Sequence, residues 1–271
     1  MKNKKVLIYY LLELVLTICL FSLILLFTLK LTVLNKNYFI KQLDKTNYYH
    51  ELYTEIDNDF ENYIRPSGFD ISIKNNLFTE DDLKEIINNN VDNFYKGKNI
   101  EIDTSKIKDK LNSNIEEYCN KINITITDDD SINLFKEEFL KIYTNRIIIS
   151  DKINDLNKTF IKYNKLINIL FISILSLFII LSIITRILFK KITLFIPIIT
   201  SILLFIVSYI FIVSKINISS IKFWNTSVSN IIKNIFNDNI KYILYICIIG
   251  IILELLKLII FIINRKRKKR V

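Results

Sequence analysis

The sequence predicts an all-α membrane protein with four transmembrane helices and a mainly helical extracytoplasmic domain between the first and the second. Hydrophobic residues make up 51% of the 271 residues, and four apolar stretches are each long enough to cross a bilayer, which takes about 20 residues. A long polar segment with apolar residues at helical spacing separates the first stretch from the second. Only three glycines and two prolines occur, which argues against enzymes built on glycine-rich phosphate loops.

The predicted transmembrane helices cover residues 6–29, 166–189, 192–213 and 242–263. The last three carry Ile, Leu and Phe on every helical face, as expected for helices surrounded by lipid. The first follows three lysines, as a signal peptide would. It is longer than the apolar core of a cleavable signal, however, and no small-residue cleavage site follows it. We therefore expect an uncleaved anchor.

The placement of basic residues predicts the orientation in the membrane. Segments 1–5, 190–191 and 264–271 together contain eleven Lys/Arg and no acidic residue, whereas segment 30–165 contains 20 Lys/Arg and 24 Asp/Glu. Because Lys and Arg are enriched in cytoplasmic loops, we expect both termini and the 190–191 turn in the cytoplasm. Segments 30–165 and 214–241 are then extracytoplasmic.

Alanine is absent, while Ile, Asn, Lys, Phe and Tyr are abundant. This composition is typical of an AT-rich genome, so we expect a protein of the cell membrane of a low-GC bacterium. Codon bias also explains part of the net charge of +10. The basic tail directly follows a predicted span, which favours contact with anionic headgroups. We expect membrane lipids, and no nucleic acid, as partners.

Within segment 30–165 we predict four helices. The first runs from about Leu34 to Ile64 and ends at the turn Arg65-Pro66-Ser67-Gly68. The second begins after Thr79, which is followed by three acidic residues suited to a helix N-terminus, and ends at Gly97. The third follows Asp103-Thr104-Ser105, and the fourth runs from Asp128–Asp130 directly into the second span.

Two short alternating segments in this region, Ile71–Ile73 and Ile122–Ile126, are candidates for a small pair of strands. The same region contains one cysteine, Cys119. We expect its thiol to be free and buried.

Charged residues inside the predicted spans are candidate functional groups, because burying charge in a bilayer is costly. Glu13, Glu254 and Lys257 fall within roughly 5 Å of one depth, at a rise of about 1.5 Å per residue. Glu254 and Lys257 are three residues apart and share a helix face. We expect Lys257 to form an ion pair with Glu13 or Glu254. The alternative is a proton or ion relay through the two carboxyl groups.

Few other residues suggest chemistry. His50 is the only histidine; it could act as a general base only beside a positioned nucleophile, and we expect a surface residue. Asp128–Asp130 lack the spacing of a calcium loop and better suit a helix start. We predict no metal site, no cofactor and no catalytic residue. Trp224, the only tryptophan, is expected at headgroup depth, within an interfacial helix at 219–237.

The order of an anchor, a large outer segment, a two-span hairpin, a second outer loop and a last span resembles the lipoprotein intramolecular transacylase (Lit-type) membrane proteins. Thr79-Glu80-Asp81-Asp82-Leu83, leading to Tyr95-Lys96-Gly97, is similar to an outer helix of that family. The resemblance implies catalytic histidines before the second span and in the second outer loop. Segments 139–165 and 214–241 contain no histidine, so the architecture carries over and the catalysis does not.

These features predict a non-enzymatic binding, scaffold or accessory component of the cell envelope, with another envelope protein or a lipoprotein as a candidate partner. One alternative is a lipid or lipoprotein acyl transferase acting at the outer leaflet. A second is a small transporter subunit, suggested by Glu13 and Glu254 alone.

Overall fold

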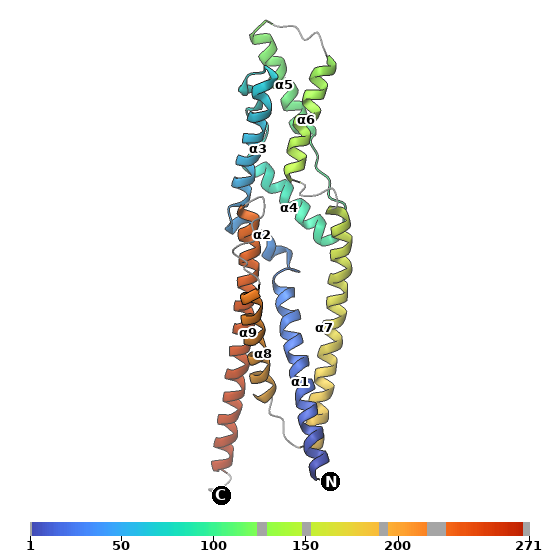
Figure 1. Ribbon diagram of the computed structural model, residues 1–271, viewed down its shortest axis with the longest axis vertical. Helices are drawn as coiled ribbons and strands as arrows, with labels where there is room; N and C mark the ends of the chain where they lie inside the picture. Colours follow the sequence, from blue (N-terminus) through green and yellow to red (C-terminus); the bar gives the residue numbers. More distant parts are fainter. Residues whose placement is uncertain (1, 124–128, 148–152, 190–194, 216–225, 268–271) are drawn as a thin grey trace. The chain divides into compact units, whose positions relative to one another are not determined.

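The computed structural model describes residues 2–123, 129–147, 153–189, 195–215 and 226–267. Within these residues every regular element is helical (Figure 1). The α-helices of the described segments are α1 (Lys2–Leu31), α2 (Lys36–Lys45), α3 (Tyr48–Ile64), α4 (Glu80–Lys96), α5 (Ser105–Lys121), α6 (Asp129–Ile147), α7 (Ile153–Phe189), α8 (Phe195–Lys215) and α9 (Thr226–Arg267). Two short 3₁₀ helices, η1 (Arg65–Ser67) and η2 (Ile71–Lys74), join α3 to α4.

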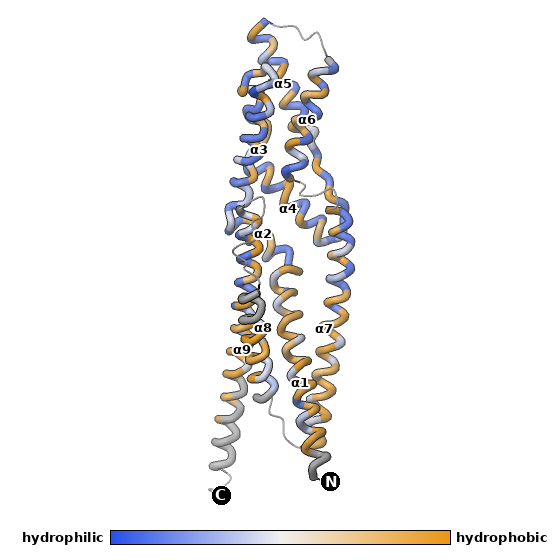
Figure 2. Tube along the Cα trace, in the orientation of Figure 1, coloured by the Kyte–Doolittle hydropathy of each residue, from blue (hydrophilic) through white to orange (hydrophobic). Residues whose placement is uncertain are grey.

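The chain forms two compact units. We call Met1–Tyr38 with Tyr163–Val271 the apolar unit, and Phe39–Lys162 the polar unit. The boundaries fall inside α2 and α7. Figure 2 shows the difference in composition: α1 and α8 are largely hydrophobic, α3 to α6 alternate, and α7 changes from hydrophilic to hydrophobic along its length.

Among the described residues, three helices are long and apolar enough to cross a membrane: Val6–Leu31, Ile153–Phe189 and Ser227–Ile252. The first two confirm long apolar helices at the first and second predicted stretches, and the third overlaps the fourth predicted stretch over residues 242–252. Helix α8 coincides with the third stretch, although its described apolar part, Pro197–Ser208, is shorter. The predicted turn at 190–191 lies outside the described residues.

In the apolar unit, α1 packs against α8 and α9, and α8 packs against α9. Ile24 of α1 and Ile243 of α9 form a small buried core with neighbours from the same three helices. Gly250 of α9 faces α8, where a Cβ would lie 3.6 Å from Ile198, an ordinary van der Waals contact. Rings of α7 contact α1 at Tyr9–Phe189 and Phe27–Phe171, and the most apolar stretch of α7 has no buried residue.

In the polar unit, α3 packs against α4 and α6, and α5 packs against α6 and η2. Figure 1 shows α4 crossing this group of helices obliquely. The rings of Phe60 and Phe139 stack with their centroids 3.8 Å apart at the centre of the core. The largest fully buried side chains described in this core are Ile56, Phe60, Ile64, Ile73, Leu77, Leu83, Leu111, Ile115, Phe139 and Tyr143.

Several predicted elements of the polar unit are confirmed. Helix α4 begins with a capping box, in which Thr79 and Asp82 each accept a hydrogen bond from the other's backbone N–H. It ends at Gly97, whose φ of 71° is in the left-handed region that glycine tolerates. The turn after α3 contains Gly68 at φ 85°. Cys119 is buried and free, as expected.

Other predictions need correction. The single helix expected over 34–64 is divided at Asn47, which has a φ of 58° and so ends the helical path between α2 and α3. Segment Ile71–Ile73 is not a strand but part of η2, whose first turn is capped by Asp70 accepting from the backbone N–H of Ser72 at 2.8 Å. Of its proposed partner, residues 124–126 lie outside the described residues.

Two further expectations concern helix boundaries. The helix predicted from Asp128 directly into the second span is described as α6, which extends to Ile147, and α7, which begins at Ile153; residues 148–152 between them lie outside the described residues. The separate helix expected at 219–237 is replaced by α9, which runs from Thr226 to Arg267. No glycine or proline lies between 226 and 249 to interrupt it.

Candidate functional site

Glu13, the first intramembrane candidate, is buried within α1 with only 6% of its surface exposed. The hydroxyl of Tyr9, one turn earlier, donates a hydrogen bond to its Oε1. The Tyr9 ring in turn packs edge-on against Phe189 of α7, with centroids 5.0 Å apart. The described partner of this carboxyl group is therefore a phenol on its own helix.

Glu254 and Lys257 are the residues expected to act together with Glu13. Glu254 and Lys257 belong to the helical backbone of α9, and their side chains lie outside the described part of the structure. Trp224 lies wholly outside the described residues. The ion pair, the relay and the interfacial anchor all stay predictions.

Hydroxyl groups connect α1 to α8 near Glu13. The Thr17 hydroxyl donates to the carbonyl oxygen of Glu13 at 2.8 Å, and its oxygen lies 3.0 Å from Oγ1 of Thr200. The hydroxyl of Ser201, which is 1% exposed, donates to the carbonyl oxygen of Thr17 at 3.1 Å. Hydrogen bonds of this kind stabilise helix pairs where water is absent.

A second polar contact joins the C-terminal end of α1, and the residues after it, to α9. The Thr32 hydroxyl lies 2.8 Å from Oδ1 of Asn239, and the Tyr38 hydroxyl donates to Oδ2 of Asp238 at 2.9 Å. Lys241 Nζ lies 3.9 Å from the other oxygen of Asp238. Sequence reasoning missed this contact, because about 200 residues separate the partners and neither side carries a recognisable motif.

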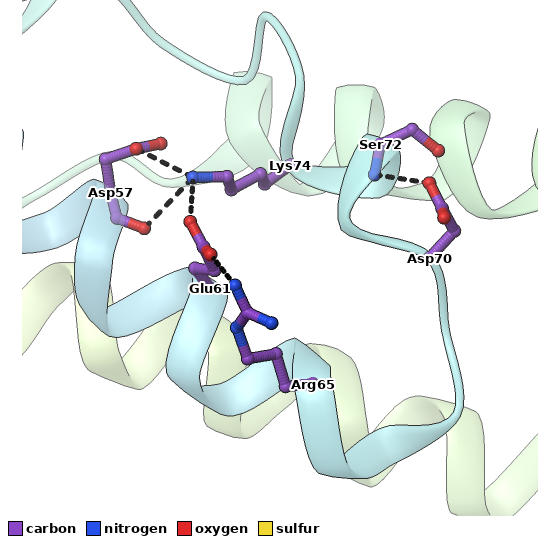
Figure 3. Close-up of polar contacts among 6 residues, drawn as sticks. All are labelled: Asp57, Glu61, Arg65, Asp70, Ser72 and Lys74. Atoms are coloured by element: carbon purple, nitrogen blue, oxygen red, sulfur yellow. Dashed lines mark hydrogen bonds and ion pairs between the residues drawn. The ribbon is translucent and has the colours of Figure 1, made fainter.

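In the polar unit, Lys74 of η2 is held against α3 by two carboxylates (Figure 3). Its Nζ lies 2.7 Å from Oδ2 of Asp57 and 3.4 Å from Oε2 of Glu61, and its side chain is only 11% exposed. Hydrogen bonds from Arg65 and Lys74 lower the pKa of Glu61 below its usual range. The group is a structural ion-pair cluster that fixes η2 on α3.

Arg146 makes a matching contact from α6. Its guanidinium bonds to Asp59 and lies 3.6 Å from Oε2 of Glu55 on α3. The hydrogen bond that Arg146 donates to Asp59 raises the pKa of Arg146. Acidic residues of α3 thus form ion pairs with one cation from η2 and one from α6. These ion pairs fix the position of α3 relative to both elements.

His50 lies on the surface of α3, as predicted, with Nδ1 3.1 Å from Oε2 of Glu80. Both side chains are about half exposed. The Thr54 hydroxyl donates its hydrogen bond to the backbone carbonyl oxygen of His50 and not to the imidazole ring, so it is not placed as a nucleophile. This His–Glu pair joins α3 to the start of α4 and has no described nucleophile in hydrogen-bond contact.

Among the described residues, no group of three or more His, Cys, Asp or Glu could hold a metal ion. Of the three aspartates predicted to start a helix, Asp128 lies outside the described residues, and Asp129 and Asp130 begin α6. The search for similar proteins found nothing: no protein-family model, no curated protein and no solved structure matches this chain.

Proposed function

We propose that this chain is a four-span integral membrane protein whose polar unit lies outside the cytoplasm and binds another component of the cell envelope. The observation that carries the proposal is the contrast between the two units. One exposes long apolar helices, and the other buries its own core beneath a charged surface. Such a chain suits a membrane anchor joined to a folded binding domain.

Membrane insertion is supported by the side chains that the apolar helices expose. On α7, Ile172 and Ile187 are 63% and 71% exposed, and the apolar residues around them are similarly open. In water a surface of this kind would drive aggregation. In lipid it is the expected outer face of a helix.

Extracytoplasmic placement of the polar unit is supported by charge. The eleven Lys/Arg of the two tails and the 190–191 turn have no acidic neighbours, whereas residues 39–162 contain 17 Lys/Arg and 24 Asp/Glu. This asymmetry follows the distribution of basic residues found in membrane proteins.

A binding role for the polar unit is favoured by its surface. Exposed carboxylates lie on α4, α5 and α6, among them Glu85, Glu117 and Glu137. Residues 39–162 also have a net negative charge, with 24 Asp/Glu against 17 Lys/Arg, which suits a partner that presents cationic groups, such as a basic face of another envelope protein or of a lipoprotein. Acyl transfer, the enzymatic alternative, would have to rely on His50, and its exposed pairing with Glu80 supplies no activated nucleophile.

The topology is tested by thiol labelling in intact cells. Single cysteines at Lys141, which is exposed on α6, and at Arg270 are introduced after the native cysteines are replaced by serine. A membrane-impermeant maleimide should label position 141 without lysis and position 270 only after lysis. Labelling in the reverse order would contradict the proposed orientation.

The binding role is tested by placing a photo-crosslinking amino acid at Glu117 and at Glu137, with Ile172 as a lipid-facing control. We expect one discrete protein adduct from the polar unit and none from position 172. Absence of protein adducts at every exposed position tried on α4, α5 and α6 would contradict the binding role. It would leave the topology result unaffected.

A further inference from the structure

Five lysines gather at one end of the apolar unit. Two lie at the end of α1 and just after it, one directly precedes the apolar part of α7, and two lie in the first half of α9. The corresponding stretches 30–38, 163–165 and 226–241 contain one acidic residue, Asp238. We call this set the basic collar: Lys30, Lys36, Lys165, Lys233 and Lys241.

Contacts within the apolar unit show that these three helix segments share one level. The Thr32–Asn239 and Tyr38–Asp238 hydrogen bonds align the end of α1 with α9. Lys30 lies over the ring of Phe171, with Nζ 4.8 Å from the centroid, and so aligns the same end of α1 with α7. The lysines therefore lie on helix segments that meet at the same end of the apolar unit.

The level of the collar matches the headgroup layer of a bilayer. At about 1.5 Å per residue, Lys165 lies roughly 9 Å beyond Phe171, and Lys233 lies roughly 9 Å beyond Asn239. The headgroup region extends several ångströms beyond the hydrocarbon core. On the other side of Phe171, α7 continues with exposed aliphatic side chains such as Ile172 and Ile179.

We propose that the basic collar binds the phosphate groups of anionic glycerophospholipids in the leaflet that surrounds this end of the unit. Five ammonium groups with one carboxylate among them attract phosphate. The apolar helix faces directly below them accept the acyl chains of the same lipid. Lys30 fits this arrangement, because its ammonium group lies over the Phe171 ring, at the end of the exposed apolar face of α7.

Lipid is favoured over a soluble phosphate compound by the position of the charge. Lys165 and Lys241 are exposed next to lipid-facing helix surfaces, so an anion bound there is also in contact with the bilayer. The inference rests on the membrane insertion proposed above. It does not depend on which side of the membrane the polar unit occupies or on whether that unit binds a partner.

The test uses the full chain reconstituted in nanodiscs that contain an equal mixture of phosphatidylcholine and phosphatidylglycerol. After release, lipids that stay bound are counted by native mass spectrometry at low and high salt. We expect preferential retention of phosphatidylglycerol that weakens at high salt. Variants K30Q, K165Q and K241Q should each reduce this retention by on the order of fivefold, and the triple variant should abolish the preference.

Two controls make the result specific. K108Q, K121Q and K141Q remove the same number of charges from exposed positions of the polar unit and should leave retention unchanged. The triple variant with arginine at positions 30, 165 and 241 keeps the charge and should keep the preference, whereas K165Q alone tests the site if the triple glutamine variant fails to fold.

The outcomes separate the inference from the proposed function. A wild-type chain that enters nanodiscs but retains both lipids equally overturns the basic collar alone. Equal loss of phosphatidylglycerol in the polar-unit control overturns it too. A chain that stays soluble and does not enter nanodiscs overturns the collar together with the proposed membrane insertion.

Discussion

The polar unit places isoleucine inside and lysine outside, whereas the apolar unit exposes isoleucine and buries hydroxyl groups. Ile56 of α3 has no exposed surface, while Ile187 of α7 is largely exposed and Ser201 of α8 is almost completely buried. Each arrangement minimises free energy in a different solvent. Water drives apolar side chains inward, and lipid removes that drive, so that packing and interhelical hydrogen bonds hold the helices together.

The largest test of this comparison is to separate the units. We expect residues 39–162, expressed alone, to give a soluble helical protein with a cooperative thermal transition, because its core side chains come from within it. Circular dichroism measures both properties. A fragment that aggregates, or that melts without cooperativity, would show that the polar unit needs the rest of the chain to fold.

Truncating a large apolar side chain should have the next largest effect. The resulting loss of stability should be large in the polar unit and small in the apolar unit. Phe60→Ala removes a buried ring stacked on Phe139, so we expect a loss of about 3–5 kcal/mol in the free energy of unfolding. Ile172→Ala, on the exposed face of α7, should cost less than about 1 kcal/mol. Denaturant titration measures the first and thermal stability in detergent the second.

If the alanine variant does not fold, Phe60→Leu tests the same prediction. It leaves a smaller cavity, so it should lower the free energy of unfolding by less than the alanine variant but still measurably. Equal losses at Phe60 and Ile172 would show that α7 is packed against protein in the native membrane and is not surrounded by lipid.

In the polar unit, an ion pair should contribute to the free energy of unfolding only where it is shielded from water. Lys74→Met leaves Asp57 and Glu61 near each other without their shared cation, and we expect it to cost about 1 kcal/mol. Lys141→Met removes an exposed pair with Glu138, at 3.2 Å, and should cost less than about 0.5 kcal/mol. Urea unfolding of both variants distinguishes these values; a larger loss at Lys141 would contradict this account.

Local signals in the sequence predicted part of this fold, and distant contacts explain what they missed. The bounds of α4 follow from Thr79, Asp82 and Gly97, which act on backbone groups within one turn. The break at Asn47 has no such signal, because Thr46 and Asn47 interrupt an apolar spacing that continues from α2 into α3. Periodicity alone therefore predicted one helix where the chain forms two.

The candidate sites show the same limit. Burial of Glu13 followed from its position in an apolar stretch, whereas its bond to Tyr9 could have been suggested by their spacing of four residues. The contact between Tyr38 and Asp238 joins residues 200 apart, and Lys74 reaches α3 only because η2 replaces the expected strand. These contacts require the tertiary structure.

In the apolar unit, hydroxyl groups that join helices should contribute more than those that bond within one helix. Thr17→Val removes the contact with Thr200, and we expect a loss of about 0.6 kcal/mol in detergent. Ser176→Ala removes a hydroxyl that donates only to the carbonyl oxygen of Ile172 in its own helix, and should be nearly neutral. Thermal unfolding in detergent compares them; equal losses would indicate that Ser176 faces protein.

The smallest effect is a dependence on pH that should be confined to the polar unit. Hydrogen bonds from Ser72 lower the pKa of Asp70, those from Thr79 lower that of Asp82, and those from Ser105 lower that of Asp103. A carboxyl group with a lowered pKa in the folded state contributes its stability in full above the unfolded value, near pH 4, and loses it as the pH falls through the folded value. Unfolding of the polar unit should therefore be independent of pH between about 7 and 5 and become easier below about 4. Asp82→Asn, which cannot ionise, should lower the stability at pH 7 and make the acid decline shallower. If the decline keeps its slope in that variant, the capping box at the start of α4 is not a source of the acid sensitivity.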